Sequence, residues 1–163
     1  MVMSARTAIP ALLSLAVGAA LVASVPAVAS GPAGERTCAS GELDVSVGEP
    51  DAGAGQLYLP LHFTNTGDRP CTLRGFPGVS VLDGARRQIG EPADRDGGAP
   101  GAVSLAPGRS ATATLRTTNG PLGGACLPEG AFLKVYPPAS TDAFLLKTPF
   151  KVCSDRFTVS ATG

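Results

Sequence analysis

Short stretches of alternating apolar and polar residues recur along most of this 163-residue chain. The clearest runs from Leu57 to Thr64, where Leu or Phe occupies every odd position and His62 stands among the even ones. A period of two is typical of a β-strand with one buried face. The same pattern predicts further strands at 43–47, 79–82, 85–89, 103–105, 110–118, 132–136, 144–146 and 157–160.

Glycine and proline separate these stretches so often, with 21 Gly and 15 Pro, that long helices have no room. Asp83-Gly84 lies between two of the predicted strands and favours a hairpin with a type I′ turn. The segment from Gly90 to Gly101 is polar and rich in glycine, so we expect a loop there. Seven to nine short strands with frequent turns predict an all-β fold, an antiparallel β-sandwich.

The N-terminus has the pattern of a secretory signal peptide. Arg6 is its only charge, an apolar run extends from Ile9 to Val22, and Ala27-Val28-Ala29 is a small-x-small cleavage site. We therefore expect a signal peptide at 1–29, a disordered leader at 30–37 and a β-sandwich domain at 38–162. The alternative is an uncleaved anchor, because the apolar run approaches the ~20 residues that span a bilayer.

Cleavage after Ala29 leaves 134 residues, enough for one domain. Thirteen acids and twelve bases remain, because Arg6 leaves with the signal peptide, so the net charge is −1. The two signs are interspersed, and Arg86-Arg87 is the only basic doublet. Because nucleic-acid binders usually carry a basic stripe, this class of function is excluded.

Four cysteines remain after cleavage: Cys38, Cys71, Cys126 and Cys153. An even count in an exported chain predicts two disulfides, with three possible pairings, and no C-x-x-C spacing suggests a redox or zinc motif. A strand beginning near Cys38 should run antiparallel to the 57–63 strand, which brings Cys38 beside Cys71. A strand from Phe132 likewise begins near Cys153. We therefore predict Cys38–Cys71 and Cys126–Cys153 at strand ends, each contributing about 3.5–4 kcal/mol in the loop-entropy model.

The sequence offers only weak candidates for catalytic or metal-binding residues. His62, the only histidine, falls on the polar face of its strand and has no neighbouring acid to orient it as a hydrolase triad requires. The stretch Asp94-Arg95-Asp96-Gly97-Gly98 lacks the later bidentate Glu of a calcium loop. We expect a solvated loop there, and no catalytic residue, metal or cofactor.

The segment from Cys71 to Val79 is the candidate binding loop. Pro70 and Pro77 enclose Leu73, Arg74, Gly75 and Phe76, and Cys71 anchors them. A rigid, tethered loop with an exposed Arg is how many protease inhibitors present a bond, because preorganisation lowers the entropy cost of binding. The favoured interpretation is structural: Gly75 and Gly78 serve tight turns, while Leu73 and Phe76 pack into the sandwich edge.

Several motifs follow one another in a fixed order. They are Gly55-Gln56-Leu57-Tyr58, Phe63-Thr64-Asn65-Thr66-Gly67, Cys71-Thr72-Leu73-Arg74-Gly75-Phe76-Pro77-Gly78-Val79, Leu105-Ala106-Pro107-Gly108-Arg109-Ser110-Ala111 and Val135-Tyr136-Pro137-Pro138. With the four cysteines, this set resembles a family of secreted actinobacterial domains known only as a domain of unknown function. The resemblance covers roughly Cys38 to Val159 and implies an exported, Ig-like sandwich. It implies no activity and no catalytic residues.

Together these observations predict a secreted, extracellular, monomeric and non-enzymatic β-sandwich. Its expected role is a binding module whose partner is an unknown extracellular protein or envelope component, with no membrane span after cleavage. The first alternative is a protease inhibitor that uses the Cys71–Val79 loop. The second is a hydrolase, which the single histidine and the lack of paired, positioned acids disfavour.

Overall fold

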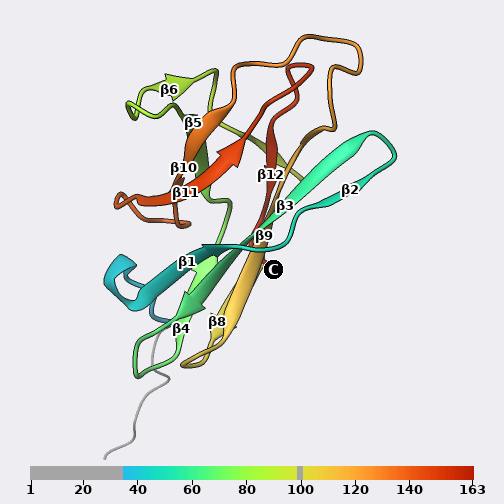
Figure 1. Cartoon of the computed structure of the whole chain (residues 1–163). Helices are drawn as coiled ribbons and strands as arrows, with labels where there is room; N and C mark the ends of the chain where they lie inside the picture. Colours follow the sequence, from blue (N-terminus) through green and yellow to red (C-terminus); the bar gives the residue numbers. More distant parts are fainter. Residues whose placement is uncertain (1–34, 99–100) are drawn as a thin grey trace, which may run out of the picture. The chain divides into compact units, whose positions relative to one another are not determined.

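The computed structural model describes residues 35–98 and 101–163 (Figure 1). This part of the chain contains twelve strands and one 3-10 turn. The predicted signal peptide at 1–29 and residues 30–34 of the predicted leader lie outside it. In chain order the elements are η1 (Ser40–Glu42), β1 (Leu43–Val47), β2 (Asp51–Gly53), β3 (Gln56–Asn65), β4 (Cys71–Arg74), β5 (Gly78–Leu82), β6 (Gln88–Ile89), β7 (Asp94–Asp96), β8 (Ala102–Leu105), β9 (Ser110–Thr118), β10 (Gly130–Tyr136), β11 (Phe144–Phe150) and β12 (Thr158–Ser160). Within the same ranges, no helix has the length and hydropathy needed to cross a membrane.

The strands form two main sheets and a ribbon. The large sheet has the order β1-β3-β9-β12-β7, with β2 also paired to β3. The small sheet has the order β11-β10-β5-β6, and β4 pairs with β8 in the ribbon. These pairings are antiparallel except that of β7 with β12, which is parallel.

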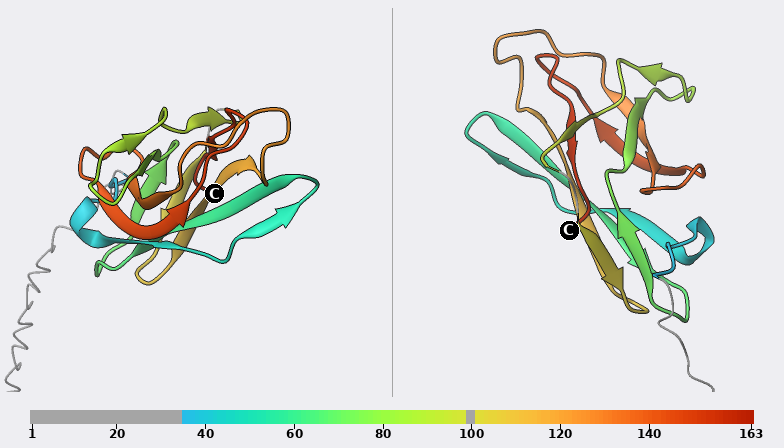
Figure 2. Two further views of the ribbon diagram at one scale, coloured as in Figure 1. Left: turned by 45° about the horizontal axis from the view of Figure 1, so that its top comes forward. Right: turned by 180° about the vertical axis from the view of Figure 1, so that it is seen from behind.

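The two main sheets are separate layers with the core between them (Figure 2). In β3, Leu59, Leu61 and Phe63 are buried, as the alternation predicts. They face a single cluster to which both sheets and the ribbon contribute: Val45, Ala111, Ala113, Leu115 and Val159 from the large sheet, Val79, Val81, Leu133, Val135 and Phe150 from the small sheet, and Leu73 and Leu105 from the ribbon. The predicted β-sandwich is therefore confirmed.

The strand count exceeds the expected seven to nine because several strands have only two or three residues. One of them, β7, lies inside the segment 90–101 that we expected to be a loop. Asp94–Asp96 pairs with Thr158–Ser160 through backbone hydrogen bonds, and Asp94 N–H donates to the carbonyl of Phe157 at 2.9 Å. Its side chains are exposed, so no alternation marks it in the sequence.

The hairpin between β5 and β6 exists, but its turn differs from the predicted type I′. Arg86 N–H donates to the carbonyl of Asp83, and Asp83 N–H donates to that of Arg87. Arg86 has φ of +63°, whereas Gly84 does not have a positive φ. This is the longer connection in which a four-residue turn is followed by one left-handed residue. The Asp83 carboxylate selects it by accepting the backbone N–H groups of Ala85 and Arg87.

Both predicted disulfides are present, Cys38–Cys71 and Cys126–Cys153. Cys71 is the first residue of β4, and Cys126 lies in the connection between β9 and β10. Cys38 and Cys153 also lie outside the strands, so the expected position at a strand end is found for Cys71 alone. The antiparallel pairing of β1 with β3 and of β10 with β11 is what brings the cysteines together.

The described chain is held to the sandwich at both ends. Arg36 and Thr37, which we expected in a disordered leader, lie along β4: Thr72 N–H donates to the carbonyl of Arg36 at 2.8 Å, and Thr37 forms a parallel bridge with Thr72. At the other end, Gly163 exchanges backbone hydrogen bonds with Thr112. The hydrogen-bonded sandwich thus includes residues on both sides of the expected range 38–162.

Candidate functional site

The candidate loop 73–76 is a strand and a connection rather than a protruding loop. Leu73 lies in β4, paired with Val103 of β8, and is fully buried. The Gly75 carbonyl accepts the backbone N–H of Thr162, and Phe76 is partly buried, with the Arg95 guanidinium 5.9 Å from the centre of its ring. Of the four residues only Arg74 is exposed. The geometry therefore fits the structural interpretation of this segment.

His62 lies on the outer side of the large sheet, opposite Leu61 and Phe63, as predicted. Its Nδ1 is 3.1 Å from the hydroxyl of Thr112 on β9, and the imidazole is partly buried. Its Nε2 lies 2.6 Å from the position that a Cβ on Gly48 would occupy, so glycine there leaves room for the ring. The hydrogen-bond partner of the imidazole is thus a hydroxyl and not the acid of a hydrolase triad.

Asp94 and Asp96, the acids of the stretch compared above with a calcium loop, lie in strand β7. Asp96 lies 3.7 Å from the Arg116 guanidinium and accepts a long hydrogen bond from Thr158. Across residues 35–98 and 101–163, no group of His, Cys, Asp and Glu side chains has an arrangement that could hold a metal ion.

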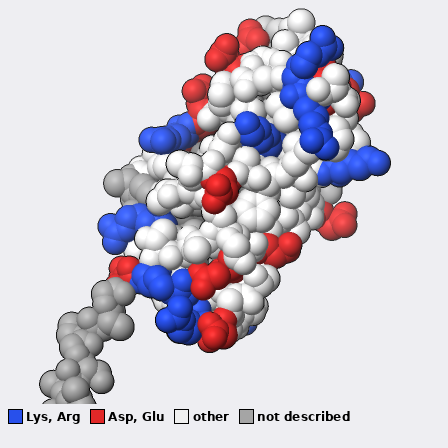
Figure 3. Space-filling model, turned by 90° about the vertical axis from the view of Figure 1, so that its left-hand side faces the viewer, with Lys and Arg blue, Asp and Glu red and all other residues white. Residues whose placement is uncertain are grey.

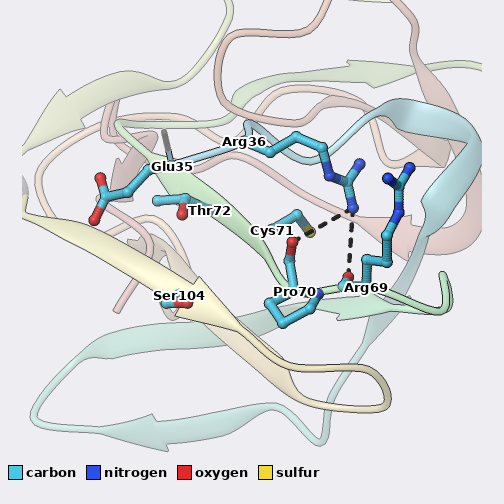
Figure 4. Close-up of a pocket in the computed structure, with 7 residues that line it drawn as sticks. All are labelled: Glu35, Arg36, Arg69, Pro70, Cys71, Thr72 and Ser104. Carbon is cyan, nitrogen blue, oxygen red and sulfur yellow. Dashed lines mark hydrogen bonds between the residues drawn. The ribbon is translucent and has the colours of Figure 1, made fainter. Parts of the chain in front are cut away.

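A hollow of about 490 Å³ lies where the first described residues meet the start of β4 (Figure 4). Its polar groups are largely used within the domain. The Arg36 guanidinium points to the carbonyls of Arg69 and Pro70 and forms an ion pair with Glu42. This hydrogen bond from Arg36 holds the pKa of the Glu42 carboxyl below its ordinary value. The hollow therefore belongs to the N-terminal attachment and has little to offer a ligand.

The outer side of the large sheet is covered mainly by hydroxyl groups. We call this the hydroxyl face; its members are Thr64, Ser110, Thr112, Thr114, Thr158 and Ser160. Several of these side chains bond to one another or to His62, for example Thr64 to Ser110 at 2.8 Å. Short hydroxyl side chains in cross-strand pairs are common on solvated sheet surfaces.

The outer side of the small sheet has a different composition. The register places Phe132 between Leu82 and Lys147, Lys134 between Ser80 and Leu145, and Tyr136 beside Gly78. We call the set Leu82, Phe132, Lys134, Tyr136, Leu145 and Lys147 the basic apolar face. Leu145 is 39% exposed, and the Lys134 ammonium lies 5.0 Å from the centre of the Tyr136 ring.

The charged side chains of the face itself are positive. Lys134 and Lys147 are the only charged residues in β5, β10 and β11, and Arg86 projects from the adjoining hairpin. None of the three makes an ion pair within the described ranges. Figure 3 shows the side of the molecule on which β5, β6 and β11 lie, where Lys, Arg, Asp and Glu side chains are spread around and within a largely uncharged area.

The nearby acid, Asp83, is already engaged. Its carboxylate lies 2.8 Å from the Arg87 guanidinium. The backbone N–H of Arg87 is the main cause that holds the pKa of the Asp83 carboxyl below its ordinary value, and the Arg87 side chain and Ala85 N–H act in the same direction. Asp83 thus remains ionised in the hairpin and leaves Arg86 free to face solvent.

A hollow of about 250 Å³ lies on the basic apolar face. Its walls are apolar with two cations at the rim: Leu82, Arg86, Lys134, Ala143, Phe144 and Leu145. A space of this size accommodates a single apolar side chain or a small ligand. Chemically, the site offers apolar contact together with positive charge.

One feature of the sequence could have indicated this face: a predicted strand that is largely apolar on both sides. In 132–136 the sequence is F-L-K-V-Y, so both alternating sides of the strand are largely apolar. A strand with one solvated side has polar residues on that side. Apolar residues on both sides of β10, which lies between β11 and β5, indicate an outer surface that is more apolar than solvation alone requires.

Comparison with known proteins gives one match. No curated protein and no solved structure matched the chain. A family model described as a domain of unknown function, DUF4232, matches residues 38–163. The matched range begins at Cys38 and includes both disulfides, both sheets and the ribbon. Because the match extends over more than half of the chain, the protein belongs to the DUF4232 family.

Proposed function

We propose that this protein is a secreted, non-enzymatic binding module that acts as a monomer outside the cell and uses the basic apolar face to hold an extracellular protein or an envelope component. The observation that carries the proposal is the difference between the two outer faces. On the small sheet Leu145 is 39% exposed beside the partly buried Phe132 and Tyr136, and apolar patches with a polar rim mark interaction sites.

The extracellular location is supported by two features. The pattern at 1–29 is typical of a secretory signal peptide. The two disulfides account for every cysteine, and such bonds persist in oxidising compartments.

The protease-inhibitor alternative has less support than this proposal. An inhibitory loop presents several consecutive exposed residues in an extended form that fits a protease cleft. Here Leu73 is buried in the core and Gly75 is bonded to the C-terminal residues. Arg74 alone is presented, so we expect no inhibition of trypsin by the intact protein.

The test is affinity capture with the chain from Ser30 to Gly163, using envelope extract and culture medium of the organism that makes it. Wild type is compared with Leu145→Ser, which removes the exposed apolar centre of the face. Leu122→Ser is the matched control, because Leu122 is also exposed, at 56%, but lies in the connection between β9 and β10. Sequencing the N-terminus of the protein from culture supernatant checks export in the same preparation.

We expect wild type and Leu122→Ser to retain the same partner, and Leu145→Ser to lose most of it. Equal capture by all three proteins, or capture of nothing, would contradict the proposed function. Intact Met1 in the membrane fraction would contradict secretion.

A further inference from the structure

The basic apolar face also suggests what kind of partner it takes. We infer that it binds an acidic peptide segment of a partner protein, in which Asp or Glu residues stand close to a large apolar side chain. This inference rests on the proposed function and specifies its ligand.

The first step is charge. Lys134, Lys147 and Arg86 surround the face without a carboxylate partner, while β5, β10 and β11 contain no acid at all. Two of these cations lie on neighbouring strands, because Lys134 pairs with Leu145 and Lys147 pairs with Phe132. The carboxylates of an extended peptide could reach both lysines, because carboxylates and ammonium groups form charge-assisted hydrogen bonds.

The second step is the apolar hollow. Leu82, Phe144 and Leu145 line it together with the cations Arg86 and Lys134. Its volume of about 250 Å³ suits one Leu or Phe side chain inserted between the cations. An apolar anchor in a pocket with charges around it is a common arrangement at the centre of protein interfaces.

The third step separates peptides from carbohydrates. Sugar hydroxyls are commonly bound by carboxylate and amide side chains, which accept and donate hydrogen bonds together. The outward residues of β5, β10 and β11 include neither group, and Ser80, their one hydroxyl apart from Tyr136, is only 8% exposed. Gln88 of β6, which pairs with Leu82, is the one amide side chain in the strands of the small sheet, and these strands contain no carboxylate. The face therefore offers few of the groups that a glycan needs.

The fourth step separates peptides from membranes. Stable electrostatic attachment to an anionic bilayer uses clusters of about four to eight Lys and Arg residues. This face has two lysines and one adjoining arginine, and they are arranged around a hollow rather than in a dense cluster. A ligand with few charges and one inserted side chain fits it better.

The experiment begins with an array of random nonapeptides probed with the labelled, full mature chain. We expect enrichment of sequences with two or more acids flanking Leu or Phe. Enriched peptides are then titrated into the protein and followed by amide chemical shifts. The shifts should concentrate on β5, β10 and β11, and the affinity should fall as NaCl is raised.

The variants are Lys134→Glu and Lys147→Glu, and the matched control is Arg109→Glu, which makes the same charge change at an exposed position in the turn before β9. We expect each lysine variant to weaken binding by about tenfold or more and the control to change it by less than about twofold. Leu145→Ser should weaken it without altering the salt dependence.

Three outcomes of the peptide experiments would overturn the inference. They are the absence of acidic enrichment in the array, chemical shifts confined to other surfaces, and equal binding by the lysine variants and the control. Binding to vesicles containing phosphatidylglycerol, with no binding to the peptides, would also overturn it in favour of a lipid surface. If Leu145→Ser still abolishes partner capture while the peptides fail, the proposed function stands and only the peptide chemistry is wrong.

Discussion

The two outer faces of the sandwich are built from the same strand geometry but have opposite chemistry. The hydroxyl face uses short side chains that satisfy one another, as in the pairs Thr64–Ser110 and His62–Thr112. The basic apolar face exposes Leu145 and presents lysines without acidic partners. Both faces belong to sheets of the same sandwich, so the second composition is not required by the fold. This difference is what points to a function on the small sheet.

A binding face on the small sheet requires that this sheet be closely packed. A substitution at Gly130 is the strongest test of that packing. A Cβ at position 130 would overlap Cγ1 of Val81 and lie 2.9 Å from the carbonyl oxygen of Leu82. We expect Gly130→Ala to lower the free energy of unfolding by about 3 kcal/mol, because neither β5 nor β11 can move away without breaking pairing. Urea denaturation measures the change.

Gly53→Ala is the matched control in the large sheet. Nothing lies within 4 Å of the Cβ position of Gly53, which is part of the exposed strand β2. We expect an effect smaller than about 0.5 kcal/mol. Equal destabilisation by both substitutions would show that the small sheet is no more closely packed than the edge of the large one.

The next test concerns the Phe63–Gly67 motif at the end of the large sheet. The fully buried Asn65 side chain donates to the carbonyls of Arg69 and Leu105 at 2.8 and 2.9 Å and accepts the N–H of Gly67. We expect Asn65→Ala to cost about 2 kcal/mol, because it leaves buried backbone groups unsatisfied.

Thr64→Ala, which removes an exposed hydroxyl bond, is its control and should cost less than about 0.5 kcal/mol. Thermal melting measures the stability of both variants, and the peptide-binding assay measures whether either one has lost binding. If Asn65→Ala abolishes binding at temperatures where it is still folded, the motif is part of a binding site and not only a structural element.

A smaller effect is expected from Asp83, which lies beside the basic apolar face. Because the folded protein depresses the pKa of this carboxyl, its contribution to stability is present at neutral pH. That contribution is lost as the pH falls below the ordinary value of about 3.9 and through the lower folded value. The melting temperature of wild type should therefore exceed that of Asp83→Asn at pH 6 and converge with it near pH 2. A constant difference across this range would show that the charge has no role.

The smallest effect is expected on the hydroxyl face. His62→Ala removes one hydrogen bond to Thr112 and some contact with Gly48, so we expect a cost of about 0.5 kcal/mol and no change in partner binding. Loss of a measurable hydrolytic activity, in an esterase and peptidase panel, would instead give this face the function and reverse the comparison.

The disulfide pairing could be predicted from the sequence, because the alternation of apolar residues marks the strands whose antiparallel pairing brings the cysteines together. Once 43–47 and 57–63 are placed as neighbouring antiparallel strands, Cys38 must lie near Cys71. Short polar strands could not be predicted in the same way. Asp94–Asp96 is held by backbone pairing with β12, and because its side chains are all exposed, the sequence shows no alternation there.

The candidate site was harder to predict for a related reason. In β10 both sides are apolar, so the period of two does not say whether Leu133 and Val135 or Phe132 and Tyr136 face the core. That choice is made by pairing with β5, where Val79 and Val81 face inward. Leu73 and Phe76, which the favoured interpretation assigned to packing at the sandwich edge, are fully and partly buried, respectively.

The attachment of Arg36 and Cys38 to β4 has a mechanical consequence. A pulling force applied to the chain at residue 35 would first load the hydrogen bonds between Arg36, Cys38 and Thr72. It would then pass through the covalent bond between Cys38 and Cys71 directly into β4. The loop that contains β1, β2 and β3 would therefore bear no tension and could not be drawn out while that bond is intact. A domain tethered through its N-terminus would keep these three strands of the large sheet under loads that unravel a sandwich lacking the bridge.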